Sequence, residues 1–393
     1  MRLRRLERRY GQLISKKRLQ SLTLSLFGLG ALWYPFSARG GQMIQSRQPS
    51  PAGFQPNRAV PGAHYIGSQA CAECHTDKVH SQQATPMGHA LEMPVVCQVL
   101  HSHSKLQFRE GSYAYAIERD GDRSIYKVTD GSRTISEPIL WAFGQGIMGQ
   151  TYVFLHDGTY REGRVSFYKQ TDGLDITIGH SASLPRSLDD ALGRVMVPDE
   201  AQACFGCHST AAAGPKKLEV DRMIPGVTCE SCHGPGENHI AAMKAGNLEE
   251  KHIFNPATLG TEDLLNFCGA CHRTWEQVAL MGLKGVNNVR FQPYRLTNSK
   301  CYDADDHRIS CLACHDPHDD LKHEPAFYDA KCNACHRQQQ SKSLASTRSA
   351  ATCRVGKQLC VTCHMPKYDL PGGHYRFTDH HIRIVKPNDP YPN

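Results

Sequence analysis

The sequence predicts a mainly α-helical and irregular fold that carries a small antiparallel β insert. Three observations predict it. The pentapeptide Cys-x-x-Cys-His occurs seven times, six of them between residues 204 and 364 at intervals too short for independent domains. Hydrophobic residues make up 40% of the chain, below the roughly 45–50% of typical globular proteins. Residues 105–185 instead alternate β-type segments with Asp-Gly pairs, which are a signal for hairpin turns.

The repeated pentapeptide is the signature of covalent haem c attachment. Its two thiols add across the haem vinyl groups, and the histidine that follows binds the iron. The cysteines are Cys71, Cys74, Cys204, Cys207, Cys229, Cys232, Cys268, Cys271, Cys311, Cys314, Cys332, Cys335, Cys360 and Cys363. The proximal histidines are His75, His208, His233, His272, His315, His336 and His364. The sequence therefore predicts a fold wrapped around seven covalently bound haem c groups, whose porphyrins supply the missing apolar surface.

Two other uses of a Cys-x-x-Cys pair are less consistent with this pattern. A zinc site would use such pairs two at a time, and a thioredoxin-like redox pair would occur once. Neither use gives a reason for a histidine to follow every pair directly. The recurrence of the complete pentapeptide favours haem.

Residues 1–40 read as a signal peptide or an N-terminal anchor. A basic head is followed by the short apolar stretch 22–33 and by small residues at 38–40. This order is typical of export signals, and the apolar stretch is short for a membrane span. We expect export to the periplasm or to the outer face of the cytoplasmic membrane. Membrane contact is expected only if this segment is retained as an uncleaved anchor.

The net charge of +7 comes from this leader. Residues 1–40 hold nine Lys or Arg and one Glu, which leaves a net charge of −1 for the rest of the chain. The sequence after residue 40 does not have the strongly positive net charge that is typical of nucleic-acid-binding proteins. Nucleic acid is therefore excluded as an expected partner.

The chain divides into further segments by composition. Residues 41–62 are rich in Pro, Gln and Ser and are expected to be a flexible linker. Residues 63–104 form the first haem module, residues 105–185 the β-rich insert, and residues 186–393 a six-haem cytochrome domain. The insert contains Gly144-Gln145-Gly146-Ile147-Met148-Gly149, which matches a dinucleotide-binding fingerprint. A strand-like segment follows it instead of a helix, so we interpret it as a turn.

Candidates for the sixth iron ligand come from the 15 histidines outside the motifs. Seven more histidines would complete bis-histidine coordination at every haem. His318, three residues after His315, is expected to reach a neighbouring haem because it cannot swing to the opposite face of its own. The full candidate set, with Met87 as an alternative to the first member, is His89, His180, His239, His318, His374 and His380.

Three cysteines lie outside the motifs, namely Cys97, Cys301 and Cys353. An exported location favours disulfide formation. Cys301 and Cys353 each precede a haem motif in the C-terminal cluster, by ten and seven residues. We expect these two to form a disulfide and Cys97 to remain unpaired.

Four stretches resemble exported multihaem cytochromes c: Ile66 through His89, Gly226 through Gly236, Cys311 through His318, and Cys360 through Lys367. This group includes the tetrahaem electron carrier of ammonia oxidation, hydroxylamine oxidoreductase and pentahaem nitrite reductase. The resemblance covers roughly residues 63–96 and 200–381. It implies electron transfer through closely packed, mostly bis-histidine haems.

Two functions stay open at this level. The first is an electron carrier between redox partner proteins, with a membrane quinol-linked donor as a candidate partner. The second is a reductase or oxidase of a small nitrogen or sulfur compound, of the nitrite or hydroxylamine type, with one open haem site. The chain has no Cys-x-x-Cys-Lys motif, the attachment site typical of the catalytic haem in pentahaem nitrite reductase. A structural or filament-forming haem protein is a third, less favoured class.

Overall fold

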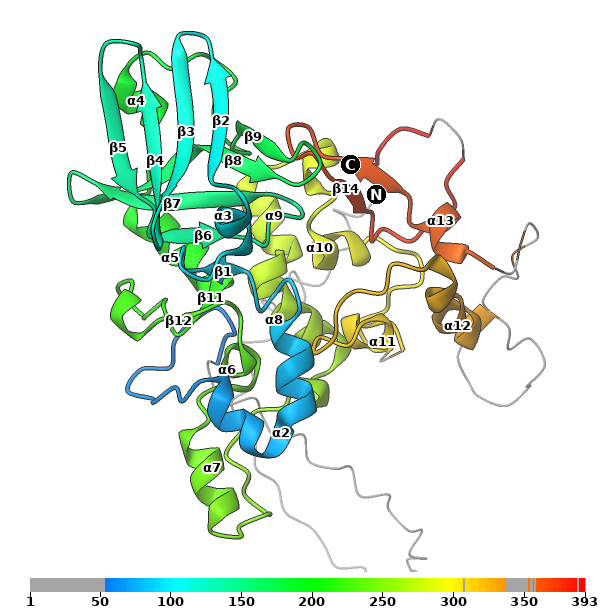
Figure 1. Ribbon diagram of the computed structural model, residues 1–393. Coiled ribbons are helices and arrows are strands. Elements are labelled where there is room, and N and C mark those ends of the chain that lie inside the picture. The colour runs from blue at the N-terminus through cyan, green and yellow to red at the C-terminus, as the bar shows by residue number, and fades with distance from the viewer. Residues whose placement is uncertain are drawn as a thin grey trace, which may run out of the picture. The chain divides into compact units, whose positions relative to one another are not determined.

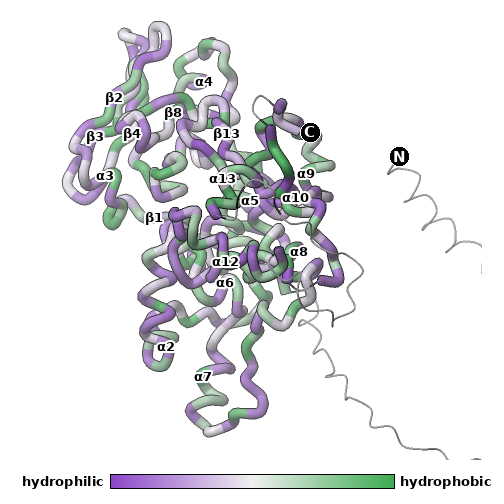
Figure 2. The backbone as a smooth tube through the Cα atoms, turned by 90° about the vertical axis from the view of Figure 1, so that its right-hand side faces the viewer, coloured by the Kyte–Doolittle hydropathy of each residue, from purple (hydrophilic) through white to green (hydrophobic). Residues whose placement is uncertain are grey.

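The computed structural model describes residues 54–306, 308–336, 353, 356, 358–386 and 389–392. All of them belong to the compact unit Gln48–Asn393. The predicted export segment 1–40 and the larger part of the predicted linker lie outside the described residues. Within the described part of the chain, no helix is long and apolar enough to cross a membrane. Figure 2 shows hydrophilic and hydrophobic residues interspersed along the chain.

The β-rich part contains two antiparallel sheets, drawn at the top left of Figure 1. The four-stranded sheet has the order β2-β3-β4-β5, with strands Lys105–Glu110, Tyr113–Asp120, Arg123–Thr129 and Thr134–Pro138. The six-stranded sheet has the order β1-β6-β7-β8-β10, and β9 pairs with β8. Its strands, in chain order, are Leu91–Glu92, Trp141–Phe143, Gln150–His156, Thr159–Tyr168, Gly173–Ile176 and Gly193–Val195. The second sheet thus recruits short strands from both sides of residues 105–185.

Turn chemistry explains the strand boundaries. Asp120-Gly121 joins β3 to β4, Asp157-Gly158 joins β7 to β8, and Asp172-Gly173 leads into β9. Gly121 and Gly158 have φ values of 61° and 72°, a region that glycine enters without steric cost. The segment Gly144–Gly149 also forms a turn, since it lies between β6 and β7. A Cβ atom on Gly144 would lie 2.6 Å from the Gly149 carbonyl oxygen, so this turn needs glycine.

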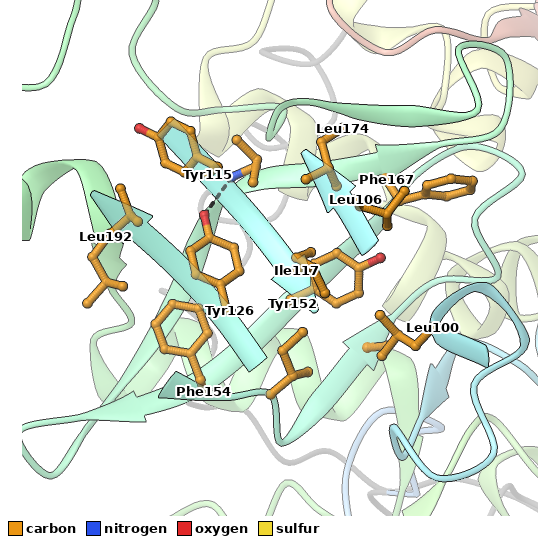
Figure 3. Packing of buried hydrophobic residues seen from close by; sticks show 14 of the residues in the cluster. Leu100, Leu106, Tyr115, Ile117, Tyr126, Tyr152, Phe154, Phe167, Leu174 and Leu192 are labelled. Atoms are coloured by element: carbon orange, nitrogen blue, oxygen red, sulfur yellow. Dashed lines mark hydrogen bonds between the residues drawn. The ribbon is translucent and has the colours of Figure 1, made fainter. Parts of the chain in front are cut away.

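The two sheets bury aromatic side chains against one another (Figure 3). Tyr126 of β4 is fully buried, and its ring centre lies 4.8 Å from that of Phe154 in β7. The Tyr126 hydroxyl accepts a hydrogen bond from the Val165 amide at 3.2 Å. The alternating burial of β4 places Ile125 and its odd-numbered neighbours outward and Tyr126 and Val128 inward. The period-two pattern of the sequence therefore builds this core.

Short helices and loops make up the remainder of the unit. The helices are α2 (Ser68–Gln83), α3 (Gln98–Ser102), α4 (Leu188–Leu192), α5 (Pro198–His208), α6 (Cys229–His233), α7 (Glu237–Lys244), α8 (Thr261–His272), α9 (Trp275–Met281), α10 (Gln292–Leu296), α11 (Cys311–Cys314), α12 (Pro325–His336) and α13 (Cys360–His364). Three 3₁₀ turns are η1 (Val220–Arg222), η2 (Pro256–Thr258) and η3 (Gly285–Asn288). Two small hairpins pair β11 (Ser209–Thr210) with β12 (Ile224–Pro225) and β13 (Lys367–Asp369) with β14 (Arg376–Thr378).

The end of the predicted linker packs against the helical part. The Phe54 ring lies 5.6 Å from Phe254 and 6.2 Å from Phe267. The Asn57 side-chain amide donates to the Ala270 carbonyl at 3.2 Å, and the Ala59 amide donates to the Ala213 carbonyl at 2.9 Å. Residues 54–59 therefore belong to the folded unit and differ from the expected tether. An aromatic residue within a Pro-rich stretch provides the anchor.

A buried ion pair connects the two sheets. The Arg164 guanidinium donates from Nε and one terminal nitrogen to the Glu110 carboxylate, both at 2.6 Å, and the two side chains are 5% and 12% exposed. Removing one partner of a buried pair leaves an uncompensated charge.

Replacement of Glu110 by Ala should therefore destabilise the protein by about 3–5 kcal/mol. The matched control is Glu118→Ala, because the Glu118 carboxylate pairs with Lys105 and Lys127 at a more exposed position. Exposed pairs contribute about 0–1 kcal/mol. Denaturant unfolding of both variants measures the difference. Equal losses in the two variants would contradict the assignment of Glu110 as a buried anchor.

Candidate functional site

Most motifs lie in the last turn of a helix or make up a short helix of their own. The second, fourth and sixth motifs form the last turns of α5, α8 and α12, and the third and seventh motifs are the whole of α6 and α13. Residues three and four apart share one helix face, so each helix presents two thiols and an imidazole on the same side. The first motif lies inside α2, where His75 leaves the helical conformation with φ −118° and ψ 40°.

One continuous cavity of about 3900 Å³ connects these helix faces. Both cysteines and the histidine of the first six motifs line it, and Val361 and Thr362 of the seventh motif also reach it. Single-ligand pockets are roughly 300–1,000 Å³, so this cavity has room for several large groups. Its position along the motifs fits a set of haems attached to them.

The orientation of the motif histidines also fits iron binding. Nδ1 of His208 hydrogen-bonds the Ala90 carbonyl at 2.9 Å, that of His233 the Phe254 carbonyl at 2.8 Å, and that of His364 the Arg383 carbonyl at 2.9 Å. A carbonyl oxygen accepts only from a protonated nitrogen, so Nδ1 carries the hydrogen in each ring. This leaves the Nε2 lone pair available to a metal, which is the usual arrangement of a ligating histidine.

Burial favours the neutral form of these imidazoles. It lowers the pKa of His208, His233, His272 and His315, because the charged form loses its hydration in the interior. His272 retains accessible surface, but this surface faces the cavity, which His272 lines. Neutral imidazole is the form that binds metal, so the local environment prepares the rings for this role.

Thiols from different motifs lie close together. The two side chains affect each other's pKa in the pairs Cys71 and Cys229, Cys207 and Cys271, Cys268 and Cys311, and Cys332 and Cys360. These four pairs bring the first motif to the third, the second to the fourth, the fourth to the fifth and the sixth to the seventh. Within the described residues no group of three or more His, Cys, Asp or Glu side chains could hold a bare metal ion, as a zinc site would need.

Two histidines outside the motifs stand opposite motif histidines. The planes of the His318 and His233 rings are nearly parallel, at 13°, with 6.0 Å between ring centres. The His380 ring lies 6.2 Å from that of His315. Metal–imidazole bonds of about 2.0–2.1 Å place the centres of two opposing rings roughly 6 Å apart. His318 together with His233, and His380 together with His315, would therefore be able to hold the irons of the haems of the third and fifth motifs.

Hydrogen bonds distinguish the other candidate ligands. His239 lines the cavity, and its Nδ1 is bound to the Lys251 carbonyl at 2.7 Å, which leaves Nε2 available. Nδ1 of His89 is bound to Glu92 at 2.7 Å, and neighbouring Met87 lines the cavity. By contrast, Nε2 of His180 contacts Glu162 at 3.0 Å, and Nε2 of His374 contacts Asp175 at 2.7 Å. The structure brings neither of these last two to a motif histidine.

The cysteines outside the motifs occupy different environments. Cys97 is fully buried in the β core, where its thiol donates to the Gln150 side-chain oxygen at 3.2 Å. Burial raises the pKa of the Cys97 thiol to about 11. Cys301 and Cys353 are exposed, and Cys301 lines the cavity. The disulfide between Cys301 and Cys353 stays a prediction.

Buried carboxylates beside the motifs were missed by the sequence analysis. Glu230 lies inside the third motif and is 2% exposed, and Asp329 lies three residues before Cys332 and is 8% exposed. Asp329 accepts hydrogen bonds from the amides of Leu359 and Cys360 at 2.7 and 2.8 Å. The sequence does show an acidic residue within or shortly before each of these two motifs. It does not show that these acids are buried, because exposed acids occur at similar positions.

Comparisons with known proteins agree with the motifs. The family described as cytochrome c554 and c-prime matches residues 183–234, which contain the second and third motifs. A high-molecular-weight cytochrome c of Nitratidesulfovibrio vulgaris (strain Hildenborough) is 26% identical over 171 residues, which is 42% of this chain and 25% of that protein. The chain therefore matches a quarter of that relative's length. No solved structure matches. Together these similarities support a multihaem cytochrome of the c type as the class of the protein.

Loss of a sixth ligand should convert one haem to the high-spin state. We expect His318→Ala to affect the haem of the third motif and His380→Ala that of the fifth, each without loss of covalent haem, since the thiols and the proximal histidine direct attachment. Electron paramagnetic resonance counts the high-spin irons. The matched control is His374→Ala, whose Nε2 is engaged by Asp175 and which should leave the spectrum unchanged. Fully low-spin spectra in both test variants would exclude His318 and His380 as iron ligands.

Proposed function

We propose that the protein is an exported heptahaem c-type cytochrome that carries electrons between redox partner proteins. The observation that supports this most directly is the chain of contacts between motifs. Haem supplies one-electron redox chemistry when bound. Each of the seven motifs would hold one haem through its two cysteines and its histidine. Closely spaced haems are what a conduit for electrons requires.

Electrostatic contacts complete the chain of motifs. In addition to the four thiol pairs, the Cys232 thiol acts electrostatically on Cys268 and Cys271, and the Cys332 thiol acts on Cys314. The third motif is thereby near the fourth, and the fifth is near the sixth, where α11 also packs against α12. All seven motifs belong to one connected series, so an electron that enters at any motif has a neighbouring site to move to.

The proposed location is the periplasm or the outer face of the cytoplasmic membrane. The basic and apolar composition of residues 1–40 supports it. Covalent haem attachment also supports it, because the haem is joined to the thiols after they have crossed the membrane. The proposed partners are redox proteins, with a membrane quinol-linked donor as a candidate among them. The net charge of −1 outside the leader gives no support to a nucleic-acid partner.

A small-molecule reductase or oxidase is the second candidate. In the described part of the chain, four histidines outside the motifs line the cavity, namely His239, His318, His323 and His380. Residues of the β insert, including Gln145, Met148 and Tyr168, form a further part of the wall without a histidine. A haem that faces this wall would retain an exchangeable sixth position, which catalysis needs.

The haem count tests the proposal directly. Protein matured with a haem-ligation system should carry seven covalent haems, because each motif provides the complete attachment set. Intact mass and a pyridine haemochrome assay measure the number independently. Five or fewer haems in fully matured protein would contradict the heptahaem proposal.

Carbon monoxide separates the two candidate functions. An electron carrier with closed haems should bind less than one carbon monoxide per protein in the fully reduced state, and it should turn over nitrite and hydroxylamine slowly. Optical titration and turnover assays measure both properties. Stoichiometric binding of carbon monoxide together with fast turnover would contradict the electron-carrier proposal and favour the reductase or oxidase.

A further inference from the structure

Glu230 is a buried carboxylate between the two cysteines of the third motif. Its side chain accepts hydrogen bonds from the Ile66 amide at 3.0 and 3.1 Å, from the Gly67 amide at 2.8 Å and from the Gly236 amide at 2.8 Å. The residue is 2% exposed. Both oxygens therefore have partners, and every partner is a donor.

This hydrogen-bond pattern is that of an ionised carboxylate. A protonated carboxyl group would have to donate its hydrogen, whereas the hydrogen bonds of both Glu230 oxygens within the described residues come from amide N–H groups. Among the described residues no Lys, Arg or His forms an ion pair with Glu230 at 4.0 Å or less. The amides stabilise the anion through their dipoles, but they leave its full negative charge in place.

The charge lies where the first and third motifs meet. Gly67, whose amide binds Glu230, precedes α2, and its carbonyl accepts a hydrogen bond from Cys71 at 3.7 Å. The thiol of Cys229, the residue before Glu230, donates to the hydroxyl of Ser68 at the start of α2 at 3.6 Å. One fixed negative charge is thus shared by two neighbouring haem sites.

Cations without acidic partners lie beside the fourth motif. Arg290 lines the cavity, and its Nε is buried without a hydrogen-bond partner. Arg273 follows His272 directly and is within electrostatic reach of Arg290. Neither guanidinium forms a salt bridge among the described residues. The Cys207 thiol donates to the carbonyl of Ala270, inside the fourth motif, at 3.8 Å. The second and fourth motifs are therefore both near positive charge.

We propose that these fixed charges give electron flow a direction, in which Glu230 makes the haems of the first and third motifs the low-potential end and Arg290 makes those of the second and fourth the high-potential end. Reduction removes one positive charge from a ferric haem. A buried anion therefore stabilises the oxidised form, and a buried cation stabilises the reduced form. This inference rests on the proposed multihaem function and adds the order in which the haems pass electrons.

The test is a spectroelectrochemical titration of the holoprotein. Glu230→Gln should raise the reduction potential of the lowest-potential haems by at least about 59 mV. For a one-electron couple this is a tenfold shift of the equilibrium toward the reduced form. The matched control is Glu237→Gln, the same change of charge at an exposed position in α7, which should leave the potentials unchanged. Glu230→Asp, which keeps the charge, should stay close to the unaltered protein. A His318→Ala background marks the third-motif haem by its high-spin signal.

Arg290→Gln provides an independent second variant. It removes a cavity-lining cation that forms no salt bridge among the described residues, and it should lower the potential of the highest-potential haems. Unchanged potentials in either Glu230→Gln or Arg290→Gln, with the full haem content retained, would overturn the inference. If Glu230→Gln fails to mature, the result for Arg290→Gln decides. A haem content of five or fewer in the unaltered protein would instead overturn the proposed function, so the two failures are distinguishable.

Discussion

Buried carboxylates that accept backbone amides from distant segments hold the haem-motif helices in place. Glu230 connects the third motif to the start of α2, and Asp329 connects the sixth motif to the seventh. Asp379, which is fully buried, binds the Arg295 guanidinium at 2.8 and 3.1 Å and so fixes the strand end before His380. A carboxylate buried in this way is stable only while its donors stay in position. Each tie is therefore a constraint on where a motif lies.

The ties matter because the motif helices have little stability of their own. Helices α6, α11 and α13 contain five, four and five residues, whereas isolated helices shorter than about 12–15 residues are marginal in water. Their order must come from tertiary contacts and from the groups that the motifs bind. Folding and cofactor binding are expected to be coupled in such a unit, which agrees with the low hydrophobic content of the chain.

The sequence contains the chemistry of the sites but not their mutual arrangement. The spacing of each Cys-x-x-Cys-His motif is local, so it can be read without a fold. Likewise Asp120-Gly121 and Asp157-Gly158 lie in turns between paired strands, because turn preference is set by the residues themselves. The opposition of His233 and His318, or of His315 and His380, depends on packing between segments. For that reason His374 and His380 looked alike in the sequence, although one contacts Asp175 and the other a motif histidine.

The β insert separates the first two motifs in the sequence, but the first haem module still contacts the second motif. The Ala90 carbonyl, within that module, accepts hydrogen bonds from the Gly144 amide at 2.8 Å and from Nδ1 of His208 at 2.9 Å. The insert also contacts the C-terminal segment, where the Tyr168 and His374 rings are 4.8 Å apart. The entropy of closing a loop grows only slowly with its length, so a large insert can be accommodated at small cost. The insert therefore leaves several motifs close to one another, and its residues form part of the wall of the cavity that the motifs line.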